Sequence, residues 1–598
     1  MYGYFDRVLR INLSNWKIST EPLNLQWVDL YIGGKGLGLR YLLEEVPKGV
    51  EPLSPQNKII IMTGPLQGTS LSTTARLVLI AKSPLTGTYS DSYIGGACSY
   101  YLKRAGYDAL IIEGKASRPV YLLIRNEEVK IEDASSFWGL DTYEVEDSLR
   151  KRYGQRSAVL SIGLAGENLV PMACITSEKS RQAGRGGLGA VFGSKNLKAI
   201  YIEGSQKPFL PDGGLDQEIK RIHRESVDGP ENEWVRANGT PITVEWSQTA
   251  GLLPVRNFQE GANPDYFKIG SEAIKKVQVG RKACQGCRIG CRRVIQFFSA
   301  RIEAPDYETL STCGSNCGVF DLEAITRFND LADRYGIDTI SLGDTIAFAM
   351  ELTEKGIHNF GIHFGETEKY LRIPELVAKR TGLGEELALG TKYLSEKYGG
   401  VDFAMHVKGQ EFPGYDPRGS WTMALAYGTA DRGADHNRGW PVGLEAFDRV
   451  LDPFTLTGKA RLIKEMQDAS AHKYSLILCE FWAASPQTQA EVLSLITGKN
   501  YTVEDLATLG ERVWNIGRIF NIREGFRKKD DLMPQRIHKD PLKEGPPQGK
   551  VVPEKDYLEA LLEYYELRGW DQNGVPTVKK LKELAIDYEA IEILQKAF

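Results

Sequence analysis

Two features that many proteins have are missing from this sequence: a long apolar run and an excess of charge of one sign. No apolar run approaches the roughly 18 residues that a membrane-spanning helix needs, and the N-terminal MYGYFDRVLRINL has charges where a signal peptide has an apolar core. The 74 basic and 78 acidic residues nearly cancel, without a long block of one sign. We therefore expect a cytoplasmic protein with no membrane span and no nucleic-acid partner.

Cysteine is also scarce, with eight in 598 residues, which is too few for a disulfide framework. Three of the eight are nevertheless crowded into RKACQGCRIGC, where Cys284, Cys287 and Cys291 have the spacing C-x2-C-x3-C. In a reducing compartment, cysteines clustered in this way more often bind metal. The spacing leaves two groups open, structural zinc and a [4Fe-4S] cluster, and both need a fourth ligand.

The best-placed fourth ligand is Cys479, because it lies in the apolar stretch SLILCEFW, far along the chain. Such a position suits a ligand that another domain donates to a buried site. Cys313 and Cys317 in STCGSNCG are rivals, although two buried small residues explain their spacing equally well.

Five cations flank the three cysteines: Arg281, Lys282, Arg288, Arg292 and Arg293. Around a site with four thiolates, they would tune a redox potential or attract an acidic electron carrier. The flanks therefore favour an iron-sulfur cluster over zinc, and we expect a small acidic iron-sulfur partner to dock over this segment. The alternative is that these cations neutralise a buried cluster or pair with carboxylates.

The pattern of apolar residues changes twice along the chain, which predicts three domains. Residues 1–206 contain short β-branched runs such as KIIIMTG and ARLVLIAK, bounded by Gly, Pro and Asn, which are typical of strands. Residues 207–405 and 406–598 have apolar residues three and four positions apart, as in DLEAITRFNDLADRYG, which is typical of helices. We expect an α+β protein with a β-rich N-terminal domain and two mainly helical domains.

The stretch GRGGLG, residues 184–189, matches the G-x-G-x-x-G pattern of dinucleotide-binding loops. That pattern needs a preceding strand, and the polar TSEKSRQA in front of it has no strand-like alternation, so we expect no dinucleotide site. Its backbone N–H groups, beside Arg181, Arg185 and Lys195, still suit phosphate oxygens. The other interpretation is a tight glycine turn packed against a sheet.

The sequence resembles the aldehyde ferredoxin oxidoreductase family of tungstoenzymes in a series of segments: GGKGLGLRYLL, GPLQGTS, ARLVLIAKSPLTG, AGYDALIIEGKA, AGRGGLGAVFGSKNLKAI, the three-cysteine segment and YYELRGWDQNGVPT. The resemblance runs nearly end to end. It implies a β-rich base for a bis-pterin tungsten (or molybdenum) cofactor, two helical domains that cover it, and a [4Fe-4S] cluster beside one pterin. The ligands that it implies for the cluster are Cys284, Cys287, Cys291 and Cys479.

The resemblance also implies how the cofactor is held. The family's pterin motif, D-x-x-G-L-D/C, matches DRYGID, which begins at Asp333 and ends at Asp338, an acceptor for hydrogen bonds from a pterin ring. A second copy should end at Cys479, but YSLILC has Tyr474 at the aspartate position and Ile477 at the glycine position. The second copy therefore departs from the pattern twice.

Other expected contacts to the cofactor come from basic and glycine positions, and a Mg2+ ion is expected to bridge the pterin phosphates. These contacts, again implied by the resemblance, are Arg76, Gly95, Gly96, Arg181, Gly184, Arg185, Gly186 and Arg438. Arg438 lies near a position where the family often has lysine.

Two residues match the family's acid–base pair near tungsten, Glu308 in APDYE and His436 in RGADH. Without the resemblance, the simpler interpretation of Glu308 is a carboxylate on the surface, and that of His436 is a capping or core histidine. Oxidation of an aldehyde needs a carboxylate that activates water and a proton donor that polarises the carbonyl, and a dry pocket tunes both pKa values. Glu308 is accordingly the expected base and His436 the expected proton donor.

Some homodimeric members of the family bridge their subunits through a metal bound by E-x-x-H. This chain has Arg327 and Asp330 at those positions, so we expect no metal-bridged homodimer.

The sequence thus predicts a tungsten-pterin oxidoreductase that oxidises aldehydes to carboxylic acids and passes electrons through the cluster to ferredoxin or a ferredoxin-like subunit. Two alternatives stay open: the catalytic subunit of a low-potential reductase of the benzoyl-CoA reductase type, and, more remotely, a non-catalytic scaffold stabilised by zinc. The presence of Glu308 and His436 favours the aldehyde reaction.

Overall fold

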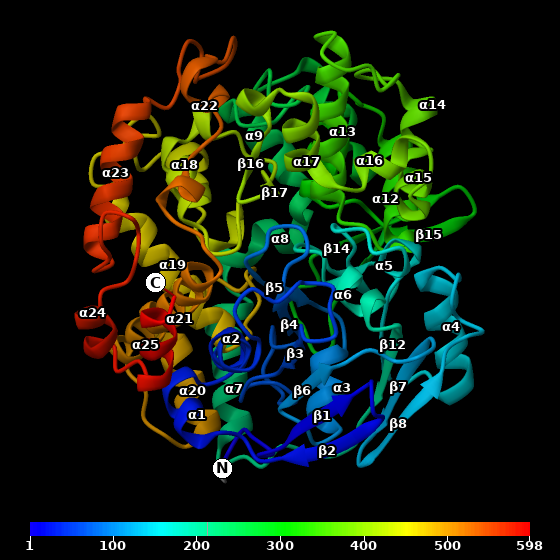
Figure 1. The fold of residues 1–598 in the computed structure, drawn as a ribbon, viewed down its shortest axis with the longest axis vertical. Coiled ribbons are helices and arrows are strands. Elements are labelled where there is room, and N and C mark those ends of the chain that lie inside the picture. Colours follow the sequence, from blue (N-terminus) through cyan, green and yellow to red (C-terminus); the bar gives the residue numbers. More distant parts are fainter. Residues whose placement is uncertain (212, 598) are drawn as a thin grey trace.

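Two six-stranded sheets form the N-terminal part of the chain in the computed structural model, which describes residues 1–211 and 213–597 (Figure 1). The strand order of the first sheet is β2 (Lys17–Glu21), β1 (Val8–Asn12), β6 (Ala109–Glu113), β3 (Ile59–Met62), β4 (Leu77–Lys82) and β5 (Tyr89–Ile94). The order of the second is β11 (Arg181–Ala183), β10 (Ile175–Ser177), β9 (Ala158–Ser161), β12 (Leu197–Glu203), β7 (Val120–Arg125) and β8 (Glu128–Asp133). In both sheets parallel and antiparallel pairs are mixed.

The two sheets share an apolar core. Leu79 of the first sheet lies in the same buried cluster as Leu122 and Leu160 of the second. The alternate residues of β4, Val78 and Ile80, are equally buried, but they belong to the core that the helical part of the chain completes. A sheet buried on both faces needs nearly continuous apolar strands, which explains runs such as KIIIMTG.

The strands predicted from apolar runs, β1, β3, β4, β6, β7 and β8, are confirmed. The sequence analysis missed β2, β5 and β9 to β12. Strand β5 has the sequence YSDSYI, in which Ser90, Asp91 and Ser92 are buried polar residues. An apolar pattern cannot reveal such a strand, because its buried residues are polar.

Helices dominate the rest of the chain, so the protein is α+β, as predicted (Figure 1). The stretch DLEAITRFNDLADRYG forms α12 (Leu322–Tyr335), as predicted. The helical pattern of residues 207–405 continues in α13 (Thr339–Glu354), α15 (Ile373–Lys379), α16 (Leu383–Leu387) and α17 (Gly390–Tyr398). Gly336 ends α12 with a φ of 70°, and Asp338 then caps α13.

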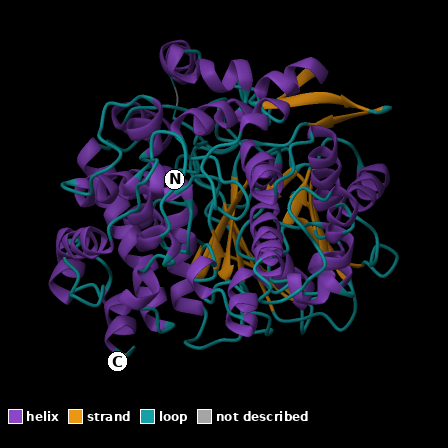
Figure 2. Cartoon of the chain, turned by 90° about the horizontal axis from the view of Figure 1, so that it is seen from above, coloured by secondary structure: helices purple, strands orange, loops and turns teal. Residues whose placement is uncertain are grey.

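The C-terminal stretches form α23 (Glu554–Leu567), α24 (Val578–Glu583) and α25 (Tyr588–Gln595), and Phe598, the end of the last predicted stretch, lies outside the described residues. The described helices contain no apolar segment of the length that a membrane span requires. Figure 2 shows the strands of the large sheets in the interior, with helices around them. The division of the helical part at residues 405 and 406 stays a prediction.

Helix α2 (Gly34–Glu45) connects the first sheet to the C-terminal helices α19 (Lys459–Ser475) and α21 (Val503–Arg523). A Cβ atom at Gly34 would lie 2.4 Å from the carbonyl oxygen of Tyr474, so only glycine fits where α2 meets the end of α19. This contact fixes the segment that leads to Cys479 against the β-rich part.

A small three-stranded sheet carries the cysteine segment. Its strands are β13 (Gln278–Lys282), β14 (Arg292–Phe297) and β15 (Ala300–Glu303), and the loop between β13 and β14 contains the three cysteines. Figure 1 shows β15 and the hairpin beside it at the edge of the molecule. The fourth cysteine comes from the loop after α19, nearly two hundred residues away.

Candidate active site

One cavity of about 750 Å³ lies where the cysteine loop, strand β5, the glycine loop after β11, the segment of His436 and the end of α19 meet. The predicted site residues that line it are Arg76, Gly95, Arg181, Gly184, Arg185, Cys284, Cys287, Cys291, Glu308, Asp333, Asp338, His436, Arg438 and Cys479. Such a cavity has the size of a cofactor or ligand site. The structure therefore brings together residues that are up to four hundred positions apart.

Two predicted cofactor contacts, Gly96 and Gly186, do not line the cavity. A Cβ at position 96 would lie 2.7 Å from an oxygen of Glu178, and one at position 186 would lie 1.9 Å from the hydroxyl of Ser90. Both glycines have positive φ angles, 91° and 87°. In the structure they permit close packing behind the wall of the cavity.

Cys479, and neither of its rivals, joins the three cysteines of the loop. Its N–H donates to the carbonyl oxygen of Thr73 at 3.0 Å, which holds it at the cavity. Burial raises the pKa of the Cys287 thiol, and the nearby Cys479 thiol raises it further. Cys313 instead donates to the carbonyl oxygen of Thr339 at 3.0 Å, in the core.

The four thiols are not arranged around a single ion. Within residues 1–211 and 213–597, no three His, Cys, Asp or Glu side chains are grouped closely enough to hold one metal ion. Zinc needs four ligands at about 2.0 to 2.3 Å from one centre, whereas a cluster of four irons binds cysteines that are farther apart.

Glu308 and His436 face each other across the cavity. Oε1 of Glu308 lies 3.6 Å from Nε2 of His436, and Oε2 of Glu308 accepts the N–H of Gly414 at 2.9 Å. Among the described residues, Oε1 of Glu308 and Nδ1 of His436 have no hydrogen-bond partner. Burial raises the pKa of Glu308, while His436, the Gly414 N–H and Arg185 oppose this rise. A buried carboxyl with a free oxygen suits proton transfer.

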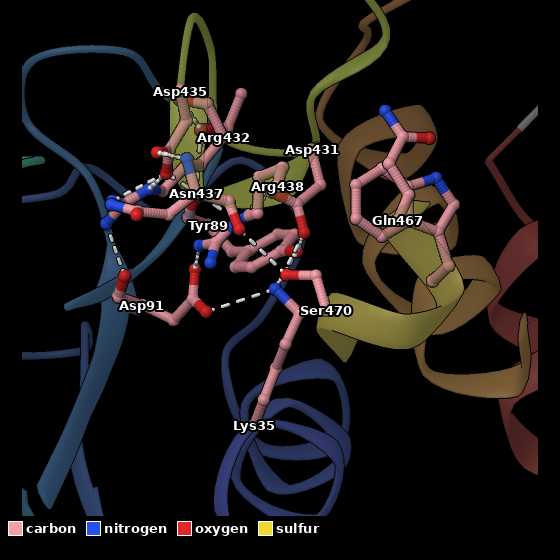
Figure 3. Close-up of polar contacts among 12 residues, drawn as sticks. Lys35, Tyr89, Asp91, Asp431, Arg432, Asp435, Asn437, Arg438, Gln467 and Ser470 are labelled. Carbon is pink, nitrogen blue, oxygen red and sulfur yellow. Dashed lines mark hydrogen bonds and ion pairs between the residues drawn. The ribbon is translucent and has the colours of Figure 1, made fainter. Parts of the chain in front are cut away.

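A buried network of ion pairs holds the loop that carries His436, and Figure 3 shows it. Its three cations and three anions are Lys35, Arg432, Arg438, Asp91, Asp431 and Asp435. Nζ of Lys35 lies 2.6 Å from Asp431 and 3.0 Å from Asp91. Arg438 pairs with Asp91 and, at 3.0 Å, with Asp431. Each side chain of the network thus has a partner of opposite charge, which offsets the cost of burying it.

Several guanidinium groups have N–H donors that the described residues leave without hydrogen bonds. They are Nε and Nη2 of Arg181, Nε of Arg185 and Nη1 of Arg438. Arg185 also donates to the carbonyl oxygens of Ala434 and Glu411, at 2.8 and 2.7 Å, which fixes its side chain. Guanidinium donors on a cavity wall match phosphate oxygens. The residues present thus fit a cofactor that carries phosphate.

The two aspartates of the pterin motif are engaged by the protein itself. Asp338 caps α13 and lies 3.4 Å from Nε of Arg185. Asp333 accepts hydrogen bonds from Gln182 at 2.7 Å and from Asn329 at 3.0 Å. Burial raises the pKa of Asp333 to about 8. Its carboxyl therefore holds its proton to a higher pH than an ordinary aspartate does.

Of the five cations around the cysteines, only Arg281 and Arg288 are exposed. Docking of an acidic partner over this segment stays a prediction. Arg293 is buried and donates to three carbonyl oxygens, and Arg292 lines the cavity and pairs with Asp306. Nζ of Lys282 lies 3.0 Å from Oε1 of Glu303. Nη2 of Arg288 lies 2.5 Å from Oδ2 of Asp228. Carboxylates nearby in space, which the sequence could not indicate, therefore neutralise most of this charge.

The argument against a dinucleotide site also needs a correction. A strand, β11, does precede the glycine loop, and α6 (Leu188–Ser194) follows it. However, β11 is an antiparallel strand at the edge of its sheet, so the loop does not belong to a parallel β-α-β unit.

Sequence analysis missed most of the remaining wall. Apart from Tyr474, its aromatic members are Tyr93, Trp234, Tyr307, Tyr415, Trp440 and Phe481. The rings of Tyr307 and Tyr415 are 5.0 Å apart, and that of Tyr415 lies 5.7 Å from His436. These residues come from separate parts of the chain and share no motif, so no local pattern could have revealed them.

Comparisons with known proteins agree with this geometry. The family model "Aldehyde ferredoxin oxidoreductase, N-terminal domain" matches residues 8–204, and "Aldehyde ferredoxin oxidoreductase, domains 2 & 3" matches residues 217–586. The chain is 40% identical to the "Tungsten-containing aldehyde ferredoxin oxidoreductase" of Pyrococcus furiosus, over 98% of this chain and 99% of that protein. It is 30% identical to that organism's "Aliphatic sulfonate oxidoreductase, WOR-like subunit", over 98% and 97% of the two chains.

Among solved structures, the chain is similar to the "Active site complex BamBC of Benzoyl Coenzyme A reductase in complex with 1,5 Dienoyl-CoA". The TM-score is 0.85 and the identity 24%, over 100% of this chain and 99% of that one. That likeness concerns the fold. Together with the family matches, the fold and the cavity define an oxidoreductase. The chain belongs to the aldehyde ferredoxin oxidoreductase family.

Proposed function

We propose that this protein uses a tungsten (or molybdenum) bis-pterin cofactor to oxidise aldehydes to carboxylic acids. The observation that carries the proposal is the pair formed by Glu308 and His436, 3.6 Å apart, on the wall of the cavity that also holds the four cysteines. The names of the full-length relatives support it.

The cavity wall suggests where the cofactors would bind. The free donors of Arg181, Arg185 and Arg438 would hold pterin phosphates, and the four cysteines a [4Fe-4S] cluster. A Mg2+ ion between the phosphates is proposed on the family resemblance alone. When bound, the metal-pterin and the cluster would accept the two electrons that leave the aldehyde.

The residues of the chain supply the proton chemistry. Oxidation converts one aldehyde and one water into one carboxylic acid, two protons and two electrons. Glu308 would take a proton from the attacking water through Oε1, while the Gly414 N–H holds Oε2 in place. His436 would donate a hydrogen bond to the carbonyl oxygen of the substrate. The aromatic walls would exclude bulk water and keep the pKa of Glu308 raised.

The electron acceptor in this proposal is ferredoxin or a small iron-sulfur subunit. Cys284, Cys287 and Cys291 lie on a loop near the molecular surface, which places the proposed cluster on an exit path for electrons. Arg281 and Arg288, both exposed, are the cations of this segment that an acidic partner would meet first.

The test of the proposal is metal analysis of protein purified without oxygen, combined with an assay of aldehyde-dependent reduction of ferredoxin. We expect tungsten or molybdenum, two pterins and four irons for each chain, and reduction that depends on aldehyde. Protein that contains zinc and is colourless would contradict the proposal and favour the scaffold alternative. Bound pterin with no aldehyde-dependent turnover, but with turnover of an aryl-CoA thioester, would favour the reductase alternative.

A further inference from the structure

The missing aspartate of the second pterin motif leaves an aromatic corner in the cavity. The ring of Tyr474, which stands at that position, stacks on Tyr93 with centroids 4.2 Å apart. The guanidinium of Arg438 lies 5.1 Å from the centre of the Tyr474 ring. Tyr474 therefore has a fixed ring on the cavity wall and no carboxylate to offer a ligand.

A carboxylate is nevertheless present in the same corner. Glu480 lines the cavity directly after Cys479, and among the described residues its Oε1 is buried without a hydrogen-bond partner. Burial is the main cause that raises the pKa of Tyr474, and the charge of Glu480 is the next. The same charge also raises the pKa of Arg76. These effects require that the carboxylate lies close to both residues.

The turn that carries Glu480 is held in place. Nζ of Lys473 donates to the carbonyl oxygens of Glu480 and Trp482, at 3.2 and 3.0 Å. The same Nζ lies 3.9 Å from Oε2 of Glu480, which is too far for a hydrogen bond. The backbone of the turn is therefore fixed, while Oε1 is buried without a donor among the described residues.

A comparison with Glu303 shows how the surroundings of the two carboxylates differ. Both oxygens of Glu303 also lack hydrogen bonds among the described residues, but three cations surround them, Lys282 at 3.0 Å, Arg181 at 3.3 Å and Arg292 at 3.7 Å. Among the described residues, the one cation within 4.0 Å of Glu480 is Lys473, at its other oxygen, and Arg76 acts on the carboxylate from farther away. A buried carboxylate oxygen without a partner is costly unless a ligand donates to it.

We infer that the carboxylate of Glu480 accepts hydrogen bonds from the N–H groups of a pterin ring and replaces the aspartate that is missing at position 474. A pterin presents an amino group and a ring N–H on one edge, and a carboxylate accepts two such donors at once. The stacked pair of Tyr93 and Tyr474 forms the flat wall beside that edge. This inference rests on the proposed function, because it assumes that a pterin binds.

The test measures bound pterin and iron in anaerobically purified wild type and in Glu480→Gln. The variant keeps the shape of the side chain, but the NH2 of its amide is itself a donor and cannot accept a hydrogen bond from a pterin N–H. Loss of a charge-assisted hydrogen bond weakens binding by roughly 10-fold or more, so we expect the ratio of pterin to iron to fall at least to about half. Iron should be unchanged because Cys479 is intact. The control is Glu504→Gln on the exposed face of α21.

A second variant separates this role from a structural one. Tyr474→Asp, introduced into Glu480→Gln, restores a carboxylate to the corner, and we expect it to restore pterin content. A wild-type ratio of pterin to iron in Glu480→Gln, or loss of iron together with pterin, would overturn the inference. Wild type that contains no pterin would instead contradict the proposed function, so the two failures are distinguishable.

Discussion

Arg438 and Asp91 form an ion pair that joins the loop of His436 to strand β5. Both residues are almost fully buried, and Asp91 also pairs with Lys35 at 3.0 Å. Asp91→Asn would remove one anionic partner from each of two buried cations, Lys35 and Arg438. We expect it to lower the free energy of unfolding by about 3–5 kcal/mol, measured by urea denaturation.

The matched control is the exposed pair of Arg125 and Glu203, 3.0 Å apart. Glu203→Gln should change the free energy of unfolding by less than about 1 kcal/mol. Equal effects of the two substitutions would contradict a structural role for the buried network.

The fourth cysteine gives a second prediction. Cys479 reaches the cavity with the three loop cysteines, whereas Cys313 lies in the core. Cys479→Ala should therefore lose most bound iron, and Cys313→Ala should keep it. Iron content is measured by atomic spectroscopy. Full iron in Cys479→Ala would remove this residue from the ligand set.

Parts of this account were predictable from the sequence because they are local. The strands β3 and β4 are continuous apolar runs, and Cys284, Cys287 and Cys291 have a diagnostic spacing within eight residues. The motif that ends at Asp338 also lies in one short segment. Resemblance to a family then connected these segments with Glu308 and His436, which have no local signal of their own.

Other parts depend on contacts between distant residues, which no local pattern encodes. Lys35 pairs with Asp431, almost four hundred positions away. The sequence around Lys35 alone indicates only a glycine-rich helix. The sequence left open whether the cations near the cysteines meet a partner or pair with carboxylates, because it does not show that Asp306 and Glu303 lie beside them. The sequence did not indicate strand β5, because the buried residues of this strand are polar.

The raised pKa of Asp333 predicts a dependence of stability on pH. Its folded-state pKa is about 8, whereas an ordinary aspartate titrates near about 3.9. The folded state thus holds a proton that the unfolded state releases between these values. The stabilising contribution is complete below about pH 4 and is lost as pH rises towards 8, by about 1.4 kcal/mol per pH unit.

Asp333→Asn cannot titrate, so it should remove this slope in cofactor-free protein. The measurement is urea denaturation of both proteins at several pH values from 5 to 8, where the difference between them should change steadily. Parallel curves would show that Asp333 is ionised in the folded protein.

The surface of α12 bears on assembly. Arg327 is exposed, and the carboxylate of Asp330 already accepts from Tyr143 at 3.1 Å and from Arg334 at 2.9 Å. A cation beside an engaged carboxylate repels a divalent metal. We expect a chelator to leave the molar mass in light scattering unchanged. A metal ion held between two copies by these residues would refute this prediction.

The direct test of the central claim is the turnover of Glu308→Gln with an aldehyde and a dye acceptor. The glutamine keeps the hydrogen bond from the Gly414 N–H but cannot take a proton from water. A positioned general base predicts a loss of roughly 10² to 10⁴ in kcat, with tungsten and iron retained. The exposed Glu323→Gln on α12 is the control, and it should behave as wild type.

The pH profile of the same measurement sharpens the test. Burial raises the pKa of Glu308, so the base form disappears as pH falls through a value above that of an ordinary glutamate. Wild-type kcat/KM should therefore fall on the acid side with this pKa, and the residual activity of Glu308→Gln should lack that step. A variant with full metal content, activity within a few-fold of wild type and an unchanged acid limb would contradict the account.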